Sequence, residues 1–349
     1  MDRLRVYRDM VRTRVLDLRV SALSAQGRIG ISSSCRGHEA AQVASAQAIQ
    51  PGHDVVYPYY RDIGVVLALG ITPRDILLGA LDKAAEPFSG ARQMPFHYSS
   101  RALRMPTPST SIATQIPHAV GSALASRVRG EDAVTVVYFG DGASSKGDFH
   151  EAVNFASIHR LPVVFFCENN QYAISVPVRL QVAGEGVAAR AAGYGIAGER
   201  LDGTDPAAVY QATQAAVDRA RAGGGPTLLE AVVYRLGPHT SHDDDTRYRS
   251  REEVQRWEQR DPVRLFQEHL LEMGEIDPEA DAALWQAARD EMERDLAEAE
   301  TAEPPSAESA FLHVFADTVI PNPFTRERTA VHADGSPGVY STGSGRDTP

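Results

Sequence analysis

Acidic and amide side chains follow two apolar runs that are typical of neighbouring strands. The run 133–139 (AVTVVYF) leads into Gly140-Asp141-Gly142, and the run 161–167 (LPVVFFC) ends just before Asn169-Asn170. A helix-like stretch separates the two runs, which makes the segment a strand–helix–strand unit of a parallel sheet. In such sheets ligands bind at the carboxyl ends of the strands. We therefore expect Asp141 and Asn170 to contribute to one site.

The residue types at these strand ends favour a magnesium ion and a diphosphate. An aspartate, an asparagine and nearby backbone carbonyls form an all-oxygen set, which Mg²⁺ prefers, and the ion commonly keeps phosphate oxygens among its ligands. Glycines on both sides of Asp141 let an anion approach the backbone closely. The amino end of the helix expected after Gly142 favours the same anion. A Gly-Asp-Gly sequence alone is more often a simple turn, so the argument depends on the combination.

The composition argues against several classes of protein. Hydrophobic residues make up 43% of the 349 residues, enough for a buried core, and the net charge of −11 comes without a basic block, which argues against a nucleic-acid partner. The two cysteines, Cys35 and Cys167, lie far apart, which argues against a disulfide framework. Because the first residues lack the apolar core of a signal peptide and no run could span a bilayer, we expect a cytoplasmic protein without membrane contact.

The elements that must position the site form one α/β domain with helical extensions at both ends. Apolar periodicity and helix-start residues predict helices over 3–26, 37–49, 114–129, 206–222 and much of 252–300, with Thr72 capping a further helix. Residues 227–235 are typical of a strand, whereas 84–111 are irregular. The loop 237–249 is polar and lacks apolar anchors, so we expect it to be mobile without a ligand. We expect one domain over 1–320 and a disordered tail over 321–349.

The segment from Gly140 to Asn170 resembles the thiamine diphosphate motif, which opens with Gly-Asp-Gly and closes with Asn-Asn. Most of residues 3–315 is similar to one family, the alpha subunit of the thiamine-dependent decarboxylating component of 2-oxo acid dehydrogenase complexes. The stretches that carry the resemblance are 90–98 (GARQMPFHY), 112–121 (IATQIPHAVG), 140–148, 165–175 and 234–250 (YRLGPHTSHDDDTRYRS). Gln93-Met94-Pro95 with His97-Tyr98 resembles the branched-chain type more than the pyruvate type.

The resemblance implies a fold, cofactors, partners and a reaction. The fold would be the thiamine diphosphate-binding α/β fold, a mostly parallel sheet flanked by helices. The cofactors would be thiamine diphosphate and Mg²⁺, with a beta subunit completing an α₂β₂ heterotetramer and holding the aminopyrimidine ring. The implied reaction is oxidative decarboxylation of a branched-chain 2-oxo acid of the 3-methyl-2-oxobutanoate type. The acyl group then passes reductively to a lipoyl group on a partner acyltransferase.

The resemblance also implies roles for individual residues. Asp141, Asn170 and the backbone carbonyl of Tyr172 match the Mg²⁺ ligands of the family, and His239 matches a catalytic histidine that also contacts the diphosphate. The other positions that match cofactor contacts are Tyr60, Arg61, Thr110, Ile112, Gly140, Gly142 and Ala143. The positions that match a K⁺ site of branched-chain members are Ser109, Ser111, Thr114 and Gln115.

Glu168 departs from the family pattern. Animal branched-chain members have an arginine there that touches the phosphate. A carboxylate at that place would repel a diphosphate. We therefore expect the Glu168 side chain to point away from the site or to pair with a basic neighbour.

Three alternative functions stay open at this point. The chain could be the alpha subunit of a pyruvate or acetoin dehydrogenase, an inactive scaffold for a beta chain, or a nicotinamide-dependent dehydrogenase. The presence of Asp141, Asn170, Arg61 and His239 argues against an inactive scaffold. Ala143-Ser144-Ser145 follow Gly142, so the third glycine of a dinucleotide-binding fingerprint is missing.

Overall fold

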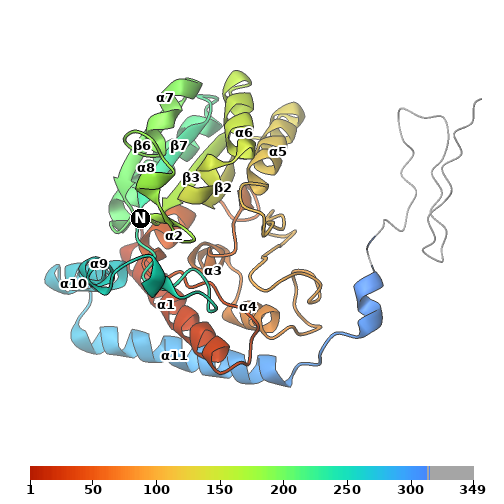
Figure 1. Cartoon of the computed structure of the whole chain (residues 1–349), viewed down its shortest axis with the longest axis vertical. Helices are drawn as coiled ribbons and strands as arrows, with labels where there is room; N and C mark the ends of the chain where they lie inside the picture. The colour runs from red at the N-terminus through yellow and green to blue at the C-terminus, as the bar shows by residue number, and fades with distance from the viewer. Residues whose placement is uncertain (313, 315–349) are drawn as a thin grey trace, which may run out of the picture. The chain divides into compact units, whose positions relative to one another are not determined.

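Five parallel strands form the sheet that carries the site, in the order β1-β2-β3-β7-β6 (Figure 1). The computed structural model describes residues 1–312 and 314, and the sheet lies in its first compact unit, Met1–Pro304. The strands are β1 (Val55–Tyr57), β2 (Thr135–Gly140), β3 (Val163–Asn169), β6 (Ala197–Asp202) and β7 (Thr227–Val232). Register pairs Gly140 with Glu168, so β2 and β3 end side by side and bring Asp141 and Asn170 to one edge.

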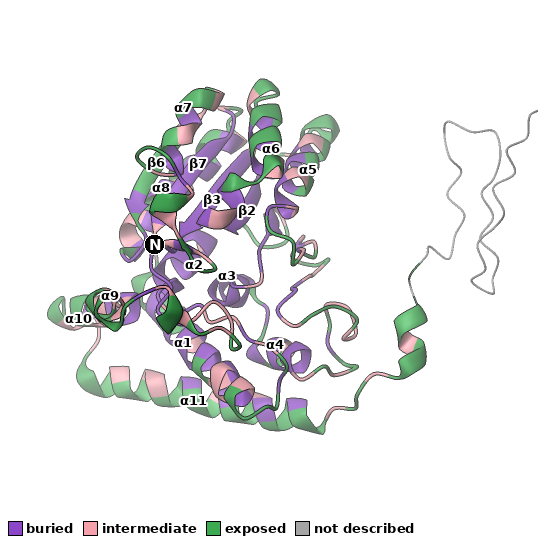
Figure 2. Ribbon diagram, viewed as in Figure 1, coloured by how far each residue is buried: buried purple, intermediate pink, exposed green. Residues whose placement is uncertain are grey.

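Helices cover both faces of the sheet, as the sequence predicts. Side chains alternate along a strand, so Tyr138 and Phe166 pack in one core with α1, α2, α3 and α8, whereas Phe139 and Phe165 pack in the other with α5 and α6. The central strands are therefore buried on both sides, which explains their continuous apolar runs (Figure 2). These helices are α1 (Arg3–Ala25), α2 (Glu39–Ala46), α3 (Ile63–Leu69), α5 (Gln115–Arg129), α6 (Gly147–Ile158) and α8 (Pro206–Arg221).

Helical extensions lie at both ends of this unit. The remaining helices are α4 (Pro73–Ala80), α7 (Ala191–Tyr194), α9 (Arg251–Glu258), α10 (Pro262–Glu272) and α11 (Pro278–Thr301). Helix α11 packs along α1 and α4, and Arg12 of α1 forms two hydrogen bonds with Glu291 of α11 at 2.6 and 2.8 Å. The predicted start of α4 is confirmed, because Thr72 and Asp75 form a capping box.

Several elements differ from those that the sequence predicts, and three differences bear on the sheet and the site. The α-helix expected directly after Gly142 begins at Gly147, because Asp141–Ser145 form a 3₁₀ turn instead. The edge strand β6 was not predicted, since its exposed Glu199 and Arg200 break any apolar pattern. A short hairpin, β4 (Tyr172–Ala173) and β5 (Val176–Pro177), follows the Asn-Asn pair.

The second unit, Pro305–Pro349, is described only as far as residues 312 and 314 and contains one 3₁₀ turn, Ala307–Phe311. The predicted tail, 321–349, lies outside the described residues, and the boundary at 320 stays a prediction. Within the described part of the chain, none of the helices is both long and apolar enough to cross a membrane.

Candidate cofactor site

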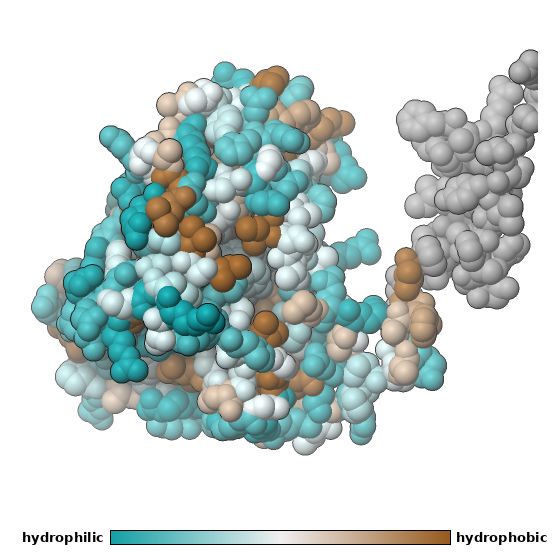
Figure 3. Space-filling model, viewed as in Figure 1, coloured by the Kyte–Doolittle hydropathy of each residue, from teal (hydrophilic) through white to brown (hydrophobic). Residues whose placement is uncertain are grey.

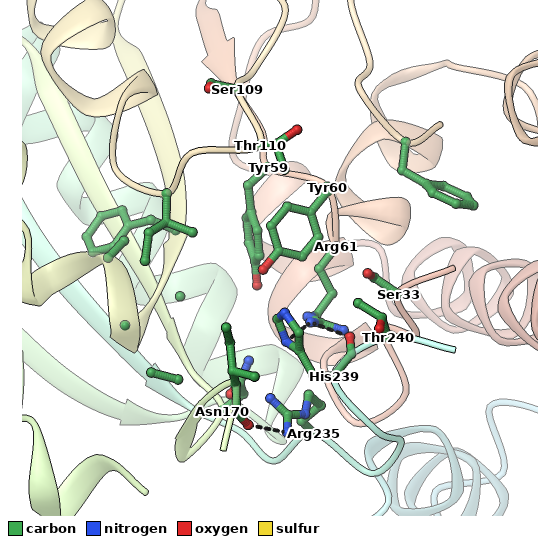
Figure 4. A pocket seen from close by; sticks show the side chains of 18 of the residues that line it. Ser33, Tyr59, Tyr60, Arg61, Ser109, Thr110, Asn170, Arg235, His239 and Thr240 are labelled. Atoms are coloured by element: carbon green, nitrogen blue, oxygen red, sulfur yellow. Dashed lines mark hydrogen bonds between the residues drawn. The ribbon is translucent and has the colours of Figure 1, made fainter. Parts of the chain in front are cut away.

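A cavity of about 470 Å³ opens where β2 and β3 end, and all of the predicted cofactor contacts line it. Seven chain segments meet there: residues 31–33 and 94–97, residues 59–61 before α3, the segment 109–115 before α5, the turn 140–143 after β2, the residues 170–174 after β3, and the segment 235–240 after β7. In Figure 4, the side chains of Arg61, His239 and Arg235 lie close together, with Asn170 beside Arg235. The parallel register of the sheet explains why distant segments converge at this edge.

Asp141 is a buried carboxylate at the floor of this cavity. One of its oxygens accepts the backbone N–H of Asn170 at 3.2 Å, and the other accepts the side-chain amide of Gln181. Burial raises the pKa of Asp141 to about 6. The Asn170 side-chain oxygen in turn accepts the backbone N–H of Tyr172 at 3.2 Å. A carboxylate and an amide oxygen thus lie on two adjoining turns of one cavity, and a divalent cation would compensate the buried charge.

Two buried arginines give the same cavity an excess of positive charge. Arg61 is 1% exposed and donates to the Ser34 carbonyl at 2.6 Å, and Arg235 is fully buried and donates to the Ile174 carbonyl at 2.7 Å. The Nε atoms of both are buried and have no hydrogen-bond partner among residues 1–312. Among the described residues neither guanidinium forms an ion pair with a carboxylate. Because a buried charge needs a partner, the pair fits an anion such as a diphosphate.

His239 is held as a neutral imidazole beside these arginines. An Arg61 Nη2 lies 3.3 Å from His239 Nδ1 and 3.2 Å from the His239 carbonyl oxygen. A guanidinium only donates, so Nδ1 accepts and the ring proton is assigned to Nε2. Burial lowers the pKa of His239 to about 3, with a further contribution from Arg61 and Arg235. His239 can therefore donate a hydrogen bond from Nε2 without carrying a charge.

Glu168 does not line the cavity, which agrees with the first of the two expected alternatives, a side chain that points away from the site. Its carboxyl is fully buried between β3 and the helical layer and accepts hydrogen bonds from Gln42 at 3.1 Å and Tyr59 at 3.0 Å. Burial raises the pKa of Glu168 to about 7, and the pKa of the neighbouring Asp62 is also raised. Neutral donors, and not a basic neighbour, therefore hold this carboxyl.

The loop 237–249 is better anchored than its sequence predicts. Tyr248 packs against Tyr172, with ring centroids 5.8 Å apart, which contradicts the expected lack of apolar anchors. Arg249 is buried and donates to the Gly237 carbonyl at 2.6 Å, and Asp243 accepts the His239 backbone N–H at 2.8 Å. Arg247, by contrast, is exposed and does not line the cavity.

The residues matched to a K⁺ site are only partly brought together. Ser109 and Gln115 line the cavity, and the Gln115 side-chain oxygen is buried without a hydrogen-bond partner. Ser111 and Thr114 do not line it, although the Ser111 N–H reaches the Ser109 hydroxyl at 3.1 Å.

Sequence reasoning missed several residues of the site. Arg235 could have been found, because it stands at the carboxyl end of the predicted strand 227–235, where ligands bind in a parallel sheet. Gln181 carries no such signal, since it lies in an irregular segment forty residues after Asp141. Tyr59 was unassigned, yet it lines the cavity and links it to Glu168.

Comparison with known proteins agrees with this geometry. The family described as dehydrogenase E1 component matches residues 7–308. The 2-oxoisovalerate dehydrogenase subunit alpha of Bacillus subtilis is 47% identical over 89% of this chain and 94% of its own length. A 3-methyl-2-oxobutanoate dehydrogenase subunit alpha of Mycobacterium tuberculosis is 44% identical over 77% and 70%, and a mitochondrial 2-oxoisovalerate dehydrogenase subunit alpha of Arabidopsis thaliana is 37% identical over 89% and 66%. The chain therefore belongs to the dehydrogenase E1 component family.

Proposed function

We propose that this chain is the alpha subunit of a branched-chain 2-oxo acid dehydrogenase. Its family implies thiamine diphosphate as cofactor and a beta subunit as partner. The observation that carries the proposal is the cavity at the strand ends, which Asp141 and Asn170 line together with two buried arginines that form no ion pair within the described part of the chain. The relatives named for 2-oxoisovalerate or 3-methyl-2-oxobutanoate favour a branched-chain acid as substrate. A pyruvate or acetoin dehydrogenase alpha subunit is the alternative.

The residues present fit the diphosphate end of the cofactor. Arg61 and Arg235 would hold the diphosphate, and Asp141, Asn170 and the Tyr172 carbonyl would hold Mg²⁺, which prefers such oxygen ligands. An added Cβ at Gly142 would lie 2.8 Å from that of Ala173, so this close approach of the two segments requires glycine. Among the described residues the Gln115 side-chain oxygen has no hydrogen-bond partner, which supports a K⁺ ion held by Gln115 and Ser109, the two predicted K⁺ residues that line the cavity. When bound, thiamine diphosphate supplies the carbon nucleophile and the electron sink of the decarboxylation.

Exposed apolar side chains around the cavity indicate that a partner protein covers it. Met94 and Ile112, which line the cavity, and Ile174 and Val176 of the adjoining hairpin are exposed apolar residues. Figure 3 shows apolar patches among mainly hydrophilic side chains on one face of the molecule. Grouped apolar side chains around an open site are typical of a protein interface. We propose that the beta subunit covers this rim within an α₂β₂ assembly that presents the site to a lipoyl-bearing acyltransferase.

The isolated chain should show no decarboxylation of any 2-oxo acid, because half of the cofactor site belongs to the proposed partner. Reduction of an artificial electron acceptor, followed with cofactor and Mg²⁺ present, measures this directly. Addition of the cognate beta chain should restore turnover. Turnover by the chain alone would contradict the two-chain assembly.

The assembled enzyme should prefer a branched 2-oxo acid to pyruvate. The methyl groups of 2-oxoisovalerate can pack on the apolar lining formed by residues such as Phe96, Ile112 and Phe139. One methylene in an apolar pocket contributes about 1–3 kcal/mol, and the two acids differ by two such carbons, so kcat/KM should differ by at least roughly 10-fold. The ratio of kcat/KM for the two acids decides the question, and a preference for pyruvate would favour the alternative function.

A further inference from the structure

Glu230 is a fully buried carboxylate that lines no part of the cavity, yet it contacts the turn that carries the proposed metal ligands. It lies on β7, next to β3 in the sheet. One oxygen accepts the side-chain N–H of Asn169 at 2.6 Å, and the other accepts the backbone N–H of Ala188 at 2.7 Å. Its ion-pair partner among the described residues, Arg200, is half-exposed and 3.6 Å away. Burial of a carboxylate costs free energy, and the two hydrogen bonds offset part of that cost. A carboxylate retained at such a place therefore suggests that these two bonds serve the site.

The first of these bonds fixes the shape of the metal-binding turn. With its N–H group engaged by Glu230, the Asn169 side chain presents its oxygen to the backbone N–H of Gln171 at 3.1 Å. Gln171 has a φ of +74°, a left-handed conformation that a non-glycine residue adopts only when its surroundings enforce it. The same turn places the Asn170 backbone N–H 3.2 Å from an Asp141 oxygen, and the Asn170 side-chain oxygen 3.2 Å from the Tyr172 N–H. Rotation of the Asn169 amide would place an NH₂ group against the Gln171 N–H.

The second bond anchors the segment that supports the other side of the site. Gly186 passes so close that an added Cβ would lie 2.7 Å from a Glu230 oxygen, and its φ is +132°. Two residues after Ala188, Arg190 donates to the carbonyl and the hydroxyl of Ser144, in the turn that begins with Asp141. Glu230 thus joins the turn after β3 to the segment that supports the turn after β2.

We propose that Glu230 is a positioning residue for the metal site: its two hydrogen bonds hold the Asp141 and Asn170 turns in the geometry that binds Mg²⁺. The inference rests on the proposed function, because it assumes that these turns hold a Mg²⁺-bound diphosphate. Partners of metal ligands typically contribute about 10- to 100-fold to metal affinity, and we expect an effect of that size here.

The Glu230→Gln variant tests the proposal in the assembled alpha–beta enzyme. Glutamine keeps the size but turns an N–H donor toward either Asn169 or Ala188, so one bond is lost. Calorimetric titration of Mg²⁺ at saturating thiamine diphosphate should show affinity weakened about 10- to 100-fold. Excess Mg²⁺ should restore kcat, with the KM for the 2-oxo acid unchanged. A merely structural defect would not be rescued by the ion.

Asp54→Asn is the matched control. Asp54 is also fully buried, accepts the Val134 N–H at 2.9 Å and pairs with Arg221 at 3.0 Å, but it precedes β1 at the opposite edge of the sheet. It should lower stability and leave the Mg²⁺ affinity unchanged.

Asn169→Ala breaks the same link from the other side. Its effect on Mg²⁺ affinity should be non-additive with that of Glu230→Gln, because the two residues act through one contact. If Glu230→Gln does not assemble, Asn169→Ala alone decides the matter. A Mg²⁺ affinity within twofold of the wild type in either variant overturns the proposal for Glu230 and leaves the proposed function standing. Absence of Mg²⁺-dependent cofactor binding in the wild type overturns the proposed function together with it.

Discussion

Replacing Asp141 with alanine should abolish Mg²⁺-dependent binding of thiamine diphosphate and leave the fold intact. Asp141 is the one charged group in the proposed Mg²⁺ set, and it is fully buried. Without it the diphosphate retains Arg61, Arg235 and backbone donors, but the ion has lost its anionic ligand. Since substitutions one layer further from a metal already cost about 10- to 100-fold, we expect a loss in affinity greater than about 100-fold.

The fold should tolerate this change because the ionised carboxylate is itself unfavourable in the cofactor-free protein. Its folded-state pKa of about 6 lies above the ordinary value of 3.8. The ionised group therefore opposes folding, and this penalty grows as the pH rises through that interval and is complete above about pH 6. Its removal offsets the loss of the hydrogen bonds from Asn170 and Gln181. Near pH 7.5 the cofactor-free variant should melt within a few degrees of the wild type.

Thermal melts with and without cofactor separate the two effects. The wild type should be stabilised by thiamine diphosphate with Mg²⁺, as any ligand of the folded state stabilises it, whereas the Asp141→Ala variant should not. Asp148→Ala is a suitable control, since this partly exposed aspartate lies in the same segment outside the cavity. A normal cofactor-induced shift in the Asp141→Ala variant would remove Asp141 from the proposed site.

The central part of the site could be predicted from the sequence because local pattern and global topology agree there. The runs 133–139 and 161–167 are almost entirely apolar, as is typical of strands covered on both faces. In a parallel sheet the carboxyl ends of neighbouring strands lie at the same edge, so the strand assignment is enough to predict that Asp141 and Asn170 are close. The register confirms this prediction, because Gly140 pairs with Glu168 and the residues that follow them therefore lie at the same edge of the sheet.

Contacts between distant segments could not be predicted in the same way. Gln181 and Glu230 act on Asp141 and Asn169 through side chains, and neither lies in a pattern that marks it. Strand β6 contains exposed charges, because an edge strand needs no alternating apolar face. The surroundings of Glu168 could not be predicted either. A glutamate is usually exposed or ion-paired, whereas packing buries this one among neutral donors.

Replacing His239 with alanine should lower kcat of the assembled enzyme by about 10²- to 10⁴-fold, the range for loss of a positioned acid–base group. With its pKa lowered to about 3, His239 is neutral in the free enzyme at physiological pH and offers the Nε2 proton as a hydrogen-bond donor. In the cofactor-free protein the His239 ring should therefore stay neutral between about pH 5 and 8, which an NMR titration of its ring protons measures.

A second substitution distinguishes the role of His239 Nδ1, which accepts from Arg61, from the role of Nε2, which carries the proton. His239→Asn keeps an acceptor near the place of Nδ1, so Arg61 should stay in position and cofactor affinity should persist while turnover is lost. His239→Ala should weaken cofactor binding as well, because Arg61 loses that partner. His242→Ala is the control: this exposed histidine, three residues further on, lies outside the cavity, so kcat should be unchanged. A kcat for His239→Ala within threefold of the wild type would show that the His239 ring serves only to hold Arg61.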